Sequence, residues 1–325
     1  MVGALLAFAS AAFFGMNNAT VRRGLLKATV LQGMVITVPL GIPLFAVFAL
    51  AMGGFAAMVR WEAANWAWMM LAGVVHLVIG RYGNYRATQA LGATLSTPIQ
   101  QFSILVALLL AFLFLDETVN VVNVIGIALV VFGPMVVLRR REAATKAARA
   151  KGFEPRYGPG FFWGLVCAFG YGTSPLLISL GLGDSGGFDD STAGVLVSHA
   201  AAAAVVLVMV AVVGGRSYML SLDRASGYWF LASAVLVALS QLFRYLALAV
   251  APVAVVVPIQ RLSVVFRILF NILINQDHES LDGWVIFSIL LAVVGAVALS
   301  MDTALLLDFL AVPGWLAEWL GRPLV

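Results

Sequence analysis

Long apolar stretches separated by short polar loops run through the chain, and each is about as long as one membrane crossing. At about 20 residues per crossing, this pattern predicts ten transmembrane helices and therefore an all-α membrane protein. The predicted spans are Val2–Thr20, Ala28–Met52, Asn65–Ala90, Thr94–Leu115, Val119–Leu138, Gly160–Leu180, Ser191–Val213, Tyr228–Val250, Val253–Ile274 and Gly283–Ser300. The tail, residues 301–325, is apolar but interrupted, and we expect Asp302–Gly321 to form an amphipathic helix in the membrane interface.

Composition supports the membrane assignment. Hydrophobic residues make up 62% of the 325 residues and charged residues only 10%, whereas soluble domains are about 25% charged. The formal net charge of +4 comes from loop residues, so we expect a lipid bilayer and a small-molecule substrate as partners and no nucleic acid. The single cysteine, Cys167, cannot form an intramolecular disulfide.

An internal repeat divides the chain into two similar halves. At an offset of 160 residues, the run Pro98-Ile99-Gln100 recurs as Pro258-Ile259-Gln260, and Tyr85 recurs as Tyr245. The predicted organisation is a five-helix unit at residues 1–138, a basic linker at 139–159 and a second five-helix unit at 160–300. An odd number of spans per unit inverts the second unit, so a pseudo-two-fold axis is expected in the membrane plane.

Two stretches carry a family resemblance. LGATLSTPIQQFSILVALLLAFLFLDETVNVVNVIGIALVVFG (Leu91–Gly133) and ALAVAPVAVVVPIQRLSVVFRILFNIL (Ala247–Leu273) resemble the repeat ends of EamA-type members of the drug/metabolite transporter superfamily. The resemblance covers about Val2–Ser300. The segment Asn275–Glu279 departs from the family pattern. Members of the family commonly have an ending similar to Leu-Gly-Glu at this position. It implies a ten-helix carrier of small metabolites, often an exporter, with a cavity between its repeats.

Basic residues in the predicted loops indicate an orientation. Twelve Lys and Arg residues lie on the side that includes the linker, and two lie on the other side. The positive-inside rule therefore predicts a cytoplasmic linker with both termini outside, in a bacterial-type inner membrane. The resembled family usually has cytoplasmic termini, so the two indications disagree.

The predicted span Val253–Ile274 contains a polar stripe. Its members recur at intervals of three or four residues: Gln260, Ser263, Arg267, Asn271 and Asn275. Because an arginine near the bilayer centre costs about 2.5–3.5 kcal/mol on insertion scales, it should face protein or a water-filled cavity. Arg267 is our first choice for a substrate contact. On an uninterrupted helix Arg261 points about 240° away, so it either braces a neighbouring helix or reaches the cavity.

The third span of each unit supplies a second polar pattern. Arg81, Asn84 and Tyr85 align with Gln241, Arg244 and Tyr245, and we expect the two clusters to approach one cavity from opposite sides. Snorkelling or helix-end contacts explain the arginines equally well. The candidate substrate-binding residues are Arg267, Gln260, Arg81, Arg244, Tyr85, Tyr245, Gln100, Asn271, Asn17 and Arg261.

No Asp or Glu falls in the middle of a predicted span. Buried cations without buried carboxylates suggest that the negative charge arrives with the substrate, for which guanidinium groups suit a carboxylate or phosphate. His76 and His199 are the only titratable alternatives within spans, and interhelical hydrogen bonding is the simpler role for each.

Sequence motifs do not indicate catalysis or ATP use. The chain has no HExxH and no GxxxxGK[ST], and its three histidines are scattered. Its one GxSxG match, Gly183–Gly187, lies between two predicted spans, without the strand-to-helix turn that this motif needs to expose a nucleophile. An enzyme, a metal centre and a cofactor are therefore not expected. The predicted function is secondary transport of a small organic anion by alternating access. An exporter of amino acids or neutral metabolites, a flippase for an anionic lipid such as a prenyl phosphate, and a non-transporting scaffold are the alternatives.

Overall fold

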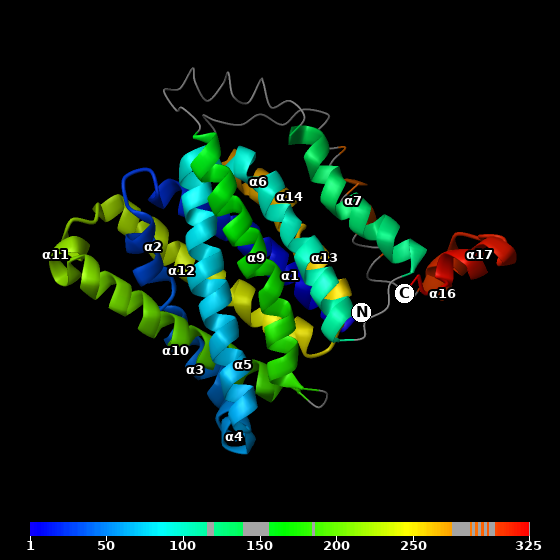
Figure 1. Ribbon diagram of the computed structural model, residues 1–325, viewed down its shortest axis with the longest axis horizontal. Helices are drawn as coiled ribbons and strands as arrows, with labels where there is room; N and C mark the ends of the chain where they lie inside the picture. The colour runs from blue at the N-terminus through cyan, green and yellow to red at the C-terminus, as the bar shows by residue number, and fades with distance from the viewer. Residues whose placement is uncertain are drawn as a thin grey trace.

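The computed structural model consists of helices joined by turns over the residues that it describes (Figure 1). These are residues 1–115, 120–138, 156–183, 186–274, 303–324 and a few single positions between 287 and 298. The basic linker 139–155 and most of the predicted span Gly283–Ser300 lie outside the described residues.

Six apolar segments of the described chain are long enough to cross a membrane. They correspond to six of the predicted spans: α1 (Val2–Gly24), α2 with α3 (Val30–Ala51), Ala63–Leu91, α9 (Tyr157–Leu182), α10 (Phe188–Val213) and α12 (Arg224–Leu248). Ala63–Leu91 combines α5 (Ala63–Gly73), a π-helix named η1 (Val74–Gly80) and the beginning of α6 (Arg81–Phe114). The remaining helices are α4 (Gly54–Arg60), α7 (Val121–Leu138), α11 (Gly215–Leu220), α13 (Val253–Gln260), α14 (Ser263–Ile274), α16 (Thr303–Phe309) and α17 (Gly314–Gly321).

Two helices predicted as continuous are interrupted. The second predicted span divides into α2 (Val30–Thr37) and α3 (Gly41–Ala51), with Pro39 in the intervening turn, because proline has no backbone N–H to continue the helix. The predicted span Val253–Ile274 divides at Arg261 and Leu262. Both amide groups there bond three residues back, Arg261 to Pro258 and Leu262 to Ile259, each at 3.0 Å. A tight turn of this kind inside a helix often marks a hinge.

Helix α6 changes direction along its length. A straight helix of 34 residues would be about 50 Å long, but the contacts of α6 with α9 first run antiparallel and then parallel to it. Three contacts show the reversal: Gly83 lies against Cys167, Leu91 against Gly160, and Val106 against Gly172. The two predicted spans Asn65–Ala90 and Thr94–Leu115 therefore pass on either side of α9. Figure 1 shows them as two blue-green columns with the green α9 between them.

The first helix packs against the end of the chain. A Cβ atom built at Gly15 would lie 2.7 Å from both the Ser263 carbonyl oxygen and the Arg267 amide nitrogen, so only glycine allows the α1 and α14 backbones to approach this closely. Nearer the start of α1, the Ser10 hydroxyl donates to the Ser240 carbonyl of α12 at 2.8 Å. Helices from the beginning and the end of the sequence thus form one packed group.

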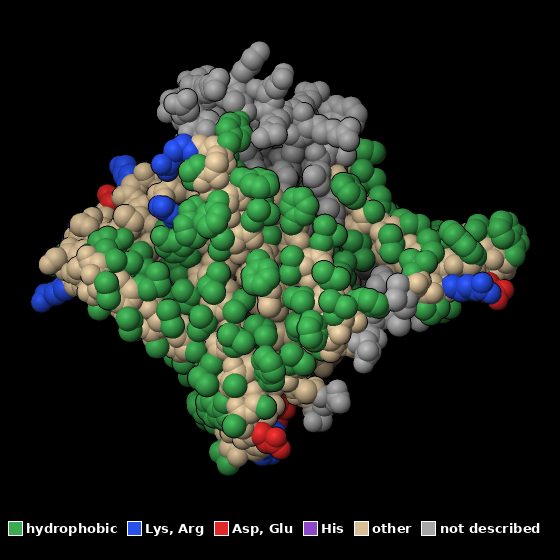
Figure 2. Space-filling view, in the orientation of Figure 1, with side chains coloured by type: hydrophobic (Ala, Val, Ile, Leu, Met, Phe, Trp, Pro, Cys, Tyr) green, Lys and Arg blue, Asp and Glu red, His purple; other side chains and the backbone are tan. Residues whose placement is uncertain are grey.

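The surface is that of a membrane protein. Figure 2 shows hydrophobic side chains over most of the face viewed, with charged side chains confined to its margins. The tail also differs from its prediction, because it forms two short helices, α16 and α17, where one was expected. They are separated by a turn that contains Ala311, at φ 50°, and Pro313. Trp315 and Trp319 are 75% and 56% exposed, and the tail extends away from the bundle in Figure 1.

Candidate functional site

A buried polar cluster lies where η1, α9 and α12 meet. Its central residue is His76, which belongs to the π-helix η1. Each turn of a π-helix contains one residue more than a turn of α-helix, and such segments are frequent at functional sites. The His76 ring stacks on Tyr171 of α9, with 4.4 Å between ring centroids, and is 7% exposed.

Arg244 is held in this cluster by neutral partners. Its Nη1 atom lies 2.8 Å from His76 Nδ1 and 3.1 Å from His76 Nε2, and its Nη2 atom donates to the Ser174 hydroxyl at 2.5 Å. Gln241 Oε1 accepts a longer bond of 3.4 Å. Because a guanidinium only donates, His76 must be the acceptor and its ring is neutral in this arrangement. Arg244 is only 4% exposed, and none of the partners that the described residues give its guanidinium is a carboxylate.

Amide and phenol groups of the first half continue the cluster on the far side of Tyr171. Asn84 donates to the Tyr171 hydroxyl at 3.2 Å and to Asn18 Oδ1 at 3.4 Å. Gln100 donates to Asn84 Oδ1 at 3.0 Å. Asn84 is the counterpart of Arg244 in the repeat, and this one aligned pair contacts the two stacked rings, Asn84 at the Tyr171 hydroxyl and Arg244 at His76.

The break between α13 and α14 brings two further polar residues to the cluster. Gln260 ends α13 and donates to the Ser10 hydroxyl at 3.1 Å. Arg261 follows in the turn. The 240° separation between Arg261 and Arg267 applies only to an uninterrupted helix. Because α13 ends at Gln260, it does not apply here, and Arg261 lines the cavity.

These residues enclose a small cavity of about 30 Å³. That is room for about one water molecule. Its walls come from α1, η1, α9, α12 and the α13–α14 break, and the lining residues are Ser10, Ala11, Phe14, His76, Tyr171, Ser240, Gln241, Arg244, Gln260 and Arg261. Among the residues that the structure describes, no Asp or Glu is buried, whereas Arg81, Arg244 and Arg267 are. The cavity is therefore electropositive.

The other predicted residues lie away from the cavity walls. Tyr245 donates to the Ser198 hydroxyl at 2.7 Å, and Asn17 accepts from Ser233 at 2.6 Å, so both connect helices. Arg267 is 5% exposed on α14 and is not among the lining residues, and the side chain of Asn271 lies outside the described residues.

Arg81 and Tyr85 are buried beside α2, not at the cavity. Several residues of the cluster were not among the predicted substrate-binding residues, including His76, Ser174 and Ser10. The only signal for them in the sequence was a polar residue within an apolar span.

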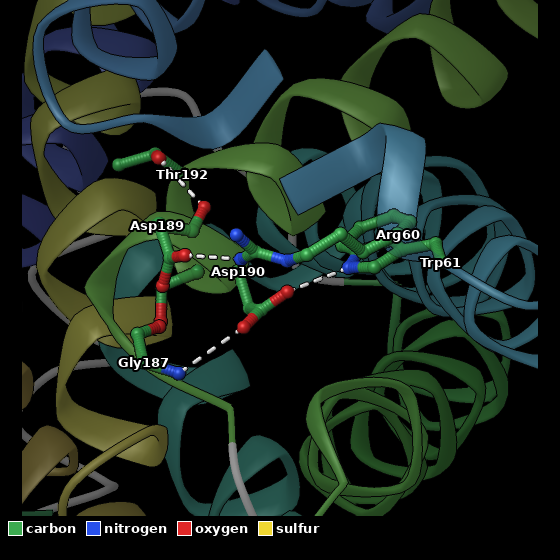
Figure 3. Close-up of polar contacts among 7 residues, drawn as sticks. Arg60, Trp61, Gly187, Asp189, Asp190 and Thr192 are labelled. Atoms are coloured by element: carbon green, nitrogen blue, oxygen red, sulfur yellow. Dashed lines mark hydrogen bonds and ion pairs between the residues drawn. The ribbon is translucent and has the colours of Figure 1, made fainter. Parts of the chain in front are cut away.

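Two polar clasps lie near opposite ends of α10: the first joins α4 to α10 itself, and the second joins α2 to α11, the short helix that follows α10. The Arg60 clasp, shown in Figure 3, consists of Arg60 Nη2 donating to Asp189 at 2.6 Å and Trp61 Nε1 donating to Asp190 at 2.7 Å. The clasp connects the end of α4 to the first turn of α10. It is exposed, with the Arg60 side chain 62% accessible.

The Tyr218 clasp is neutral. Gln32, in the first turn of α2, donates to the Tyr218 carbonyl at 3.0 Å and to the Ser221 hydroxyl at 3.1 Å, and the hydroxyls of Thr29 and Tyr218 also meet. Both clasps are formed at once.

A protein-family model matches the first 139 of the 325 residues. Residues 1–139 match the model of the EamA-like transporter family. No curated protein matches significantly. Chains of solved structures do match, and one crystal structure aligns with 91% of this chain and 96% of its own at 16% identity, with a TM-score of 0.68. At that identity the likeness shows the shared fold alone.

Proposed function

We propose that this multi-pass membrane protein, whose residues 1–139 belong to the EamA-like transporter family, is a secondary transporter of a small organic anion. The observation that carries the proposal is the buried Arg244 guanidinium, which lines the small cavity and whose hydrogen-bond partners among the described residues are all neutral. A carboxylate or phosphate entering the cavity would supply the missing charge.

The neutral partners make Arg244 available to such a ligand. A charge-assisted hydrogen bond to an anion is roughly twice as strong as one to a neutral acceptor, so an anion can displace His76 and Ser174 as acceptors. Arg261 also lines the cavity, and the Gln260 side-chain amide offers a neutral donor. We propose that these residues form the substrate site. Arg267, Gln100, Asn271, Asn17 and Tyr245 then support or extend it.

The transport cycle must open the cavity. A metabolite needs a pocket of about 300 Å³ or more, about ten times the volume enclosed here. We propose that the two clasps break alternately, so that substrate reaches Arg244 from one face and leaves from the other. Export or exchange is the expected mode, and this assignment follows the family.

We further propose ten helices in two inverted five-helix repeats. Matching contacts support this arrangement: Gly15 of α1 faces Ser263 and Phe266, and Gly172 of α9 faces Ser103 and Val106. The helix positions differ by 157 residues and those of their partners by 160, as the repeat requires. The proposed orientation has a cytoplasmic linker in an inner membrane, and a reporter active only outside the cytoplasm, fused after Val325, tests it.

The test of the anion site is a screen in proteoliposomes. Labelled carboxylates, phosphorylated metabolites and neutral amino acids are offered to the wild type, and substrate affinity is then compared in Arg244→Gln, Arg244→Lys and Arg267→Gln. Loss of one charged hydrogen bond is worth about 1.5–3 kcal/mol, so Arg244→Gln should weaken binding about ten- to a hundredfold. Arg244→Lys should rescue poorly, because the ammonium lacks the planar fork.

Arg322→Gln is the matched control, since it removes an exposed guanidinium that neither lines the cavity nor belongs to a clasp. It should retain wild-type affinity. Transport of neutral amino acids alone, or unchanged affinity in folded Arg244→Gln protein, would overturn the proposal in favour of a neutral-metabolite exporter.

A further inference from the structure

A half-buried arginine on the outer surface of the bundle is held by two aromatic rings. The guanidinium carbon of Arg86, on α6, lies 5.9 Å from the centre of the Tyr82 ring and 5.7 Å from that of the Trp163 ring. The two rings contact each other edge to face, with 5.2 Å between their centroids. A guanidinium over aromatic faces keeps its N–H groups available for hydrogen bonds, and no described residue accepts one from Arg86.

The position of Arg86 along its helix places it near the edge of the bilayer. The apolar segment to which it belongs ends at Leu91, five residues later, which is about 7–8 Å along a helix. On the neighbouring helix, Trp163 comes six residues after the start of α9 at Tyr157, or about 9 Å. The interface on each side of the hydrocarbon core is about 5–8 Å thick. Arg86 and Trp163 therefore lie near the boundary between lipid headgroups and hydrocarbon.

Neighbouring groups add positive potential to this place. Arg156 is the N-cap residue of α9, and its amide nitrogen donates to the Ala90 carbonyl oxygen at 2.9 Å, one helical turn beyond Arg86. The first turn of α9 has no acidic residue and no side-chain cap, so the positive end of the helix dipole is uncompensated there. No described carboxylate pairs with Arg86 or Arg156. The site therefore attracts an anion.

The surface beside these groups is apolar and faces outward. Phe162, Leu165 and Phe169 are exposed and recur along α9 at intervals of three and four residues, so they form one stripe. The stripe begins at the aromatic cluster, because the Phe162 ring contacts the Trp163 ring with 5.1 Å between centroids. It continues along α9 away from the end that carries Arg156. Positive charge near the headgroups and an apolar stripe leading into the hydrocarbon suit a ligand with an anionic head and apolar chains.

We propose that Arg86, held between Tyr82 and Trp163, binds the phosphate group of an anionic phospholipid whose acyl chains lie along the exposed stripe of α9. A phosphate can accept two parallel N–H···O bonds from one guanidinium. The choice of a lipid over a soluble phosphate follows from the depth of Arg86 and from the stripe beside it. An anionic headgroup is favoured over a zwitterionic one, because no described carboxylate is there to pair with an ammonium group.

The inference does not rest on the proposed function. Neither Arg86 nor its two rings line the central cavity, so the lipid is a bound component of the protein surface and not the transported substrate. Because Tyr82 and Arg86 belong to α6 and Trp163 to α9, the lipid would stabilise the contact between the two helices at their outer end.

Native mass spectrometry of the full-length protein, delipidated in detergent, tests the proposal. Phosphatidylglycerol and phosphatidylcholine with identical acyl chains are titrated, and the apparent Kd of the first bound lipid is measured. The wild type should prefer phosphatidylglycerol. Arg86→Gln should weaken phosphatidylglycerol binding about tenfold, because a charged hydrogen bond is lost. Trp163→Leu keeps every charge and should still weaken it several-fold, because the guanidinium is no longer held in place.

Arg216→Gln is the matched control, since it removes an exposed guanidinium from α11 that no described aromatic ring contacts. It should keep the wild-type affinity for phosphatidylglycerol. Equal losses in Arg216→Gln and Arg86→Gln, or equal affinities of the wild type for the two lipids, would show only a general attraction to basic surfaces and overturn the proposal.

Two further measurements separate the remaining explanations. Millimolar inorganic phosphate should not displace phosphatidylglycerol, and displacement would overturn the proposal in favour of a soluble phosphate compound. The unfolding midpoint in lipid-free detergent identifies a variant that fails to fold, and the other of Arg86→Gln and Trp163→Leu then decides. Wild-type phosphatidylglycerol affinity in either variant, once folded, would contradict the proposed site.

Discussion

At the scale of single residues, the pairing of Arg244 with His76 makes an unusual prediction. The neutral ring competes with an incoming anion for the guanidinium, because both accept from it. His76→Phe keeps the ring contact with Tyr171 and removes the competing acceptor. We expect a lower unfolding midpoint of the empty protein, together with an anion Kd several-fold lower than that of the wild type.

Binding and thermal unfolding, measured with the anion identified by transport, test this prediction. His199→Phe is the control, since this second buried histidine does not line the cavity, and it should leave the organic-anion Kd unchanged. A Kd raised by His76→Phe as much as by Arg244→Gln would instead make His76 a direct substrate ligand.

The sequence could predict part of the site at this scale. Arg244 and Gln260 were found from the repeat and from helical spacing, which need only local regularity. His76 was not placed in the site, because the π-helix shifts the direction of every later side chain relative to an α-helix. For Arg261 a bracing role and a cavity role were both open, and the turn after Gln260, which bonds three residues back, brings it to the cavity. Irregular backbone decides these directions, and hydrophobic periodicity does not report it.

At the scale of helices, the apolar pattern was a better guide. Six of the predicted spans correspond to continuous apolar segments in the structure, with ends that differ by a few residues. The pattern could not predict the division at Pro39 into α2 and α3, or the two tail helices, since apolar residues continue through each break. Turns built from apolar residues leave little trace in the composition of an apolar run.

Close backbone contact between α5 and α10 leads to a prediction at this scale. A Cβ atom at Gly73 would overlap the Ser198 carbonyl group, and backbone atoms cannot move aside as a flexible side chain can. Overpacking of this kind costs about 1–3 kcal/mol. Gly73→Ala should therefore lower the unfolding midpoint and the folded yield. Gly158→Ala, also in a helix but with open space around it, should behave as the wild type, and equal behaviour of the two variants would contradict the packing argument.

At the scale of the whole molecule, the packed groups are not the two halves of the sequence. Helix α1 contacts α12 and α14, whereas α9 contacts both parts of α6 and α5 contacts α10. The Arg244–His76 pair lies between these two groups, whereas the clasps join α4 to α10 and α2 to α11. Alternating access is therefore expected to move one mixed group of helices against the other.

Chemical cross-linking distinguishes the two kinds of contact. A bifunctional thiol reagent joining Arg60→Cys to Asp189→Cys would fix the Arg60 clasp and should abolish transport in proteoliposomes. The same reagent joining Phe8→Cys to Phe266→Cys connects α1 to α14, whose rings lie 5.2 Å apart, and should leave transport largely intact. Transport that survives the first cross-link but not the second would show that the moving groups are assigned wrongly.

The attachment of α1 to the end of the chain also bears on biosynthesis. Ser10 and its partner Ser240 are 230 positions apart. At about 5–20 residues per second, the ribosome needs roughly ten to fifty seconds to supply that partner. During this interval the first helix must wait in the bilayer with Ser10 and Asn17 uncovered by α12, which later binds them. A fragment ending at residue 139 would leave these side chains exposed to lipid permanently, and membrane quality control would be expected to degrade it.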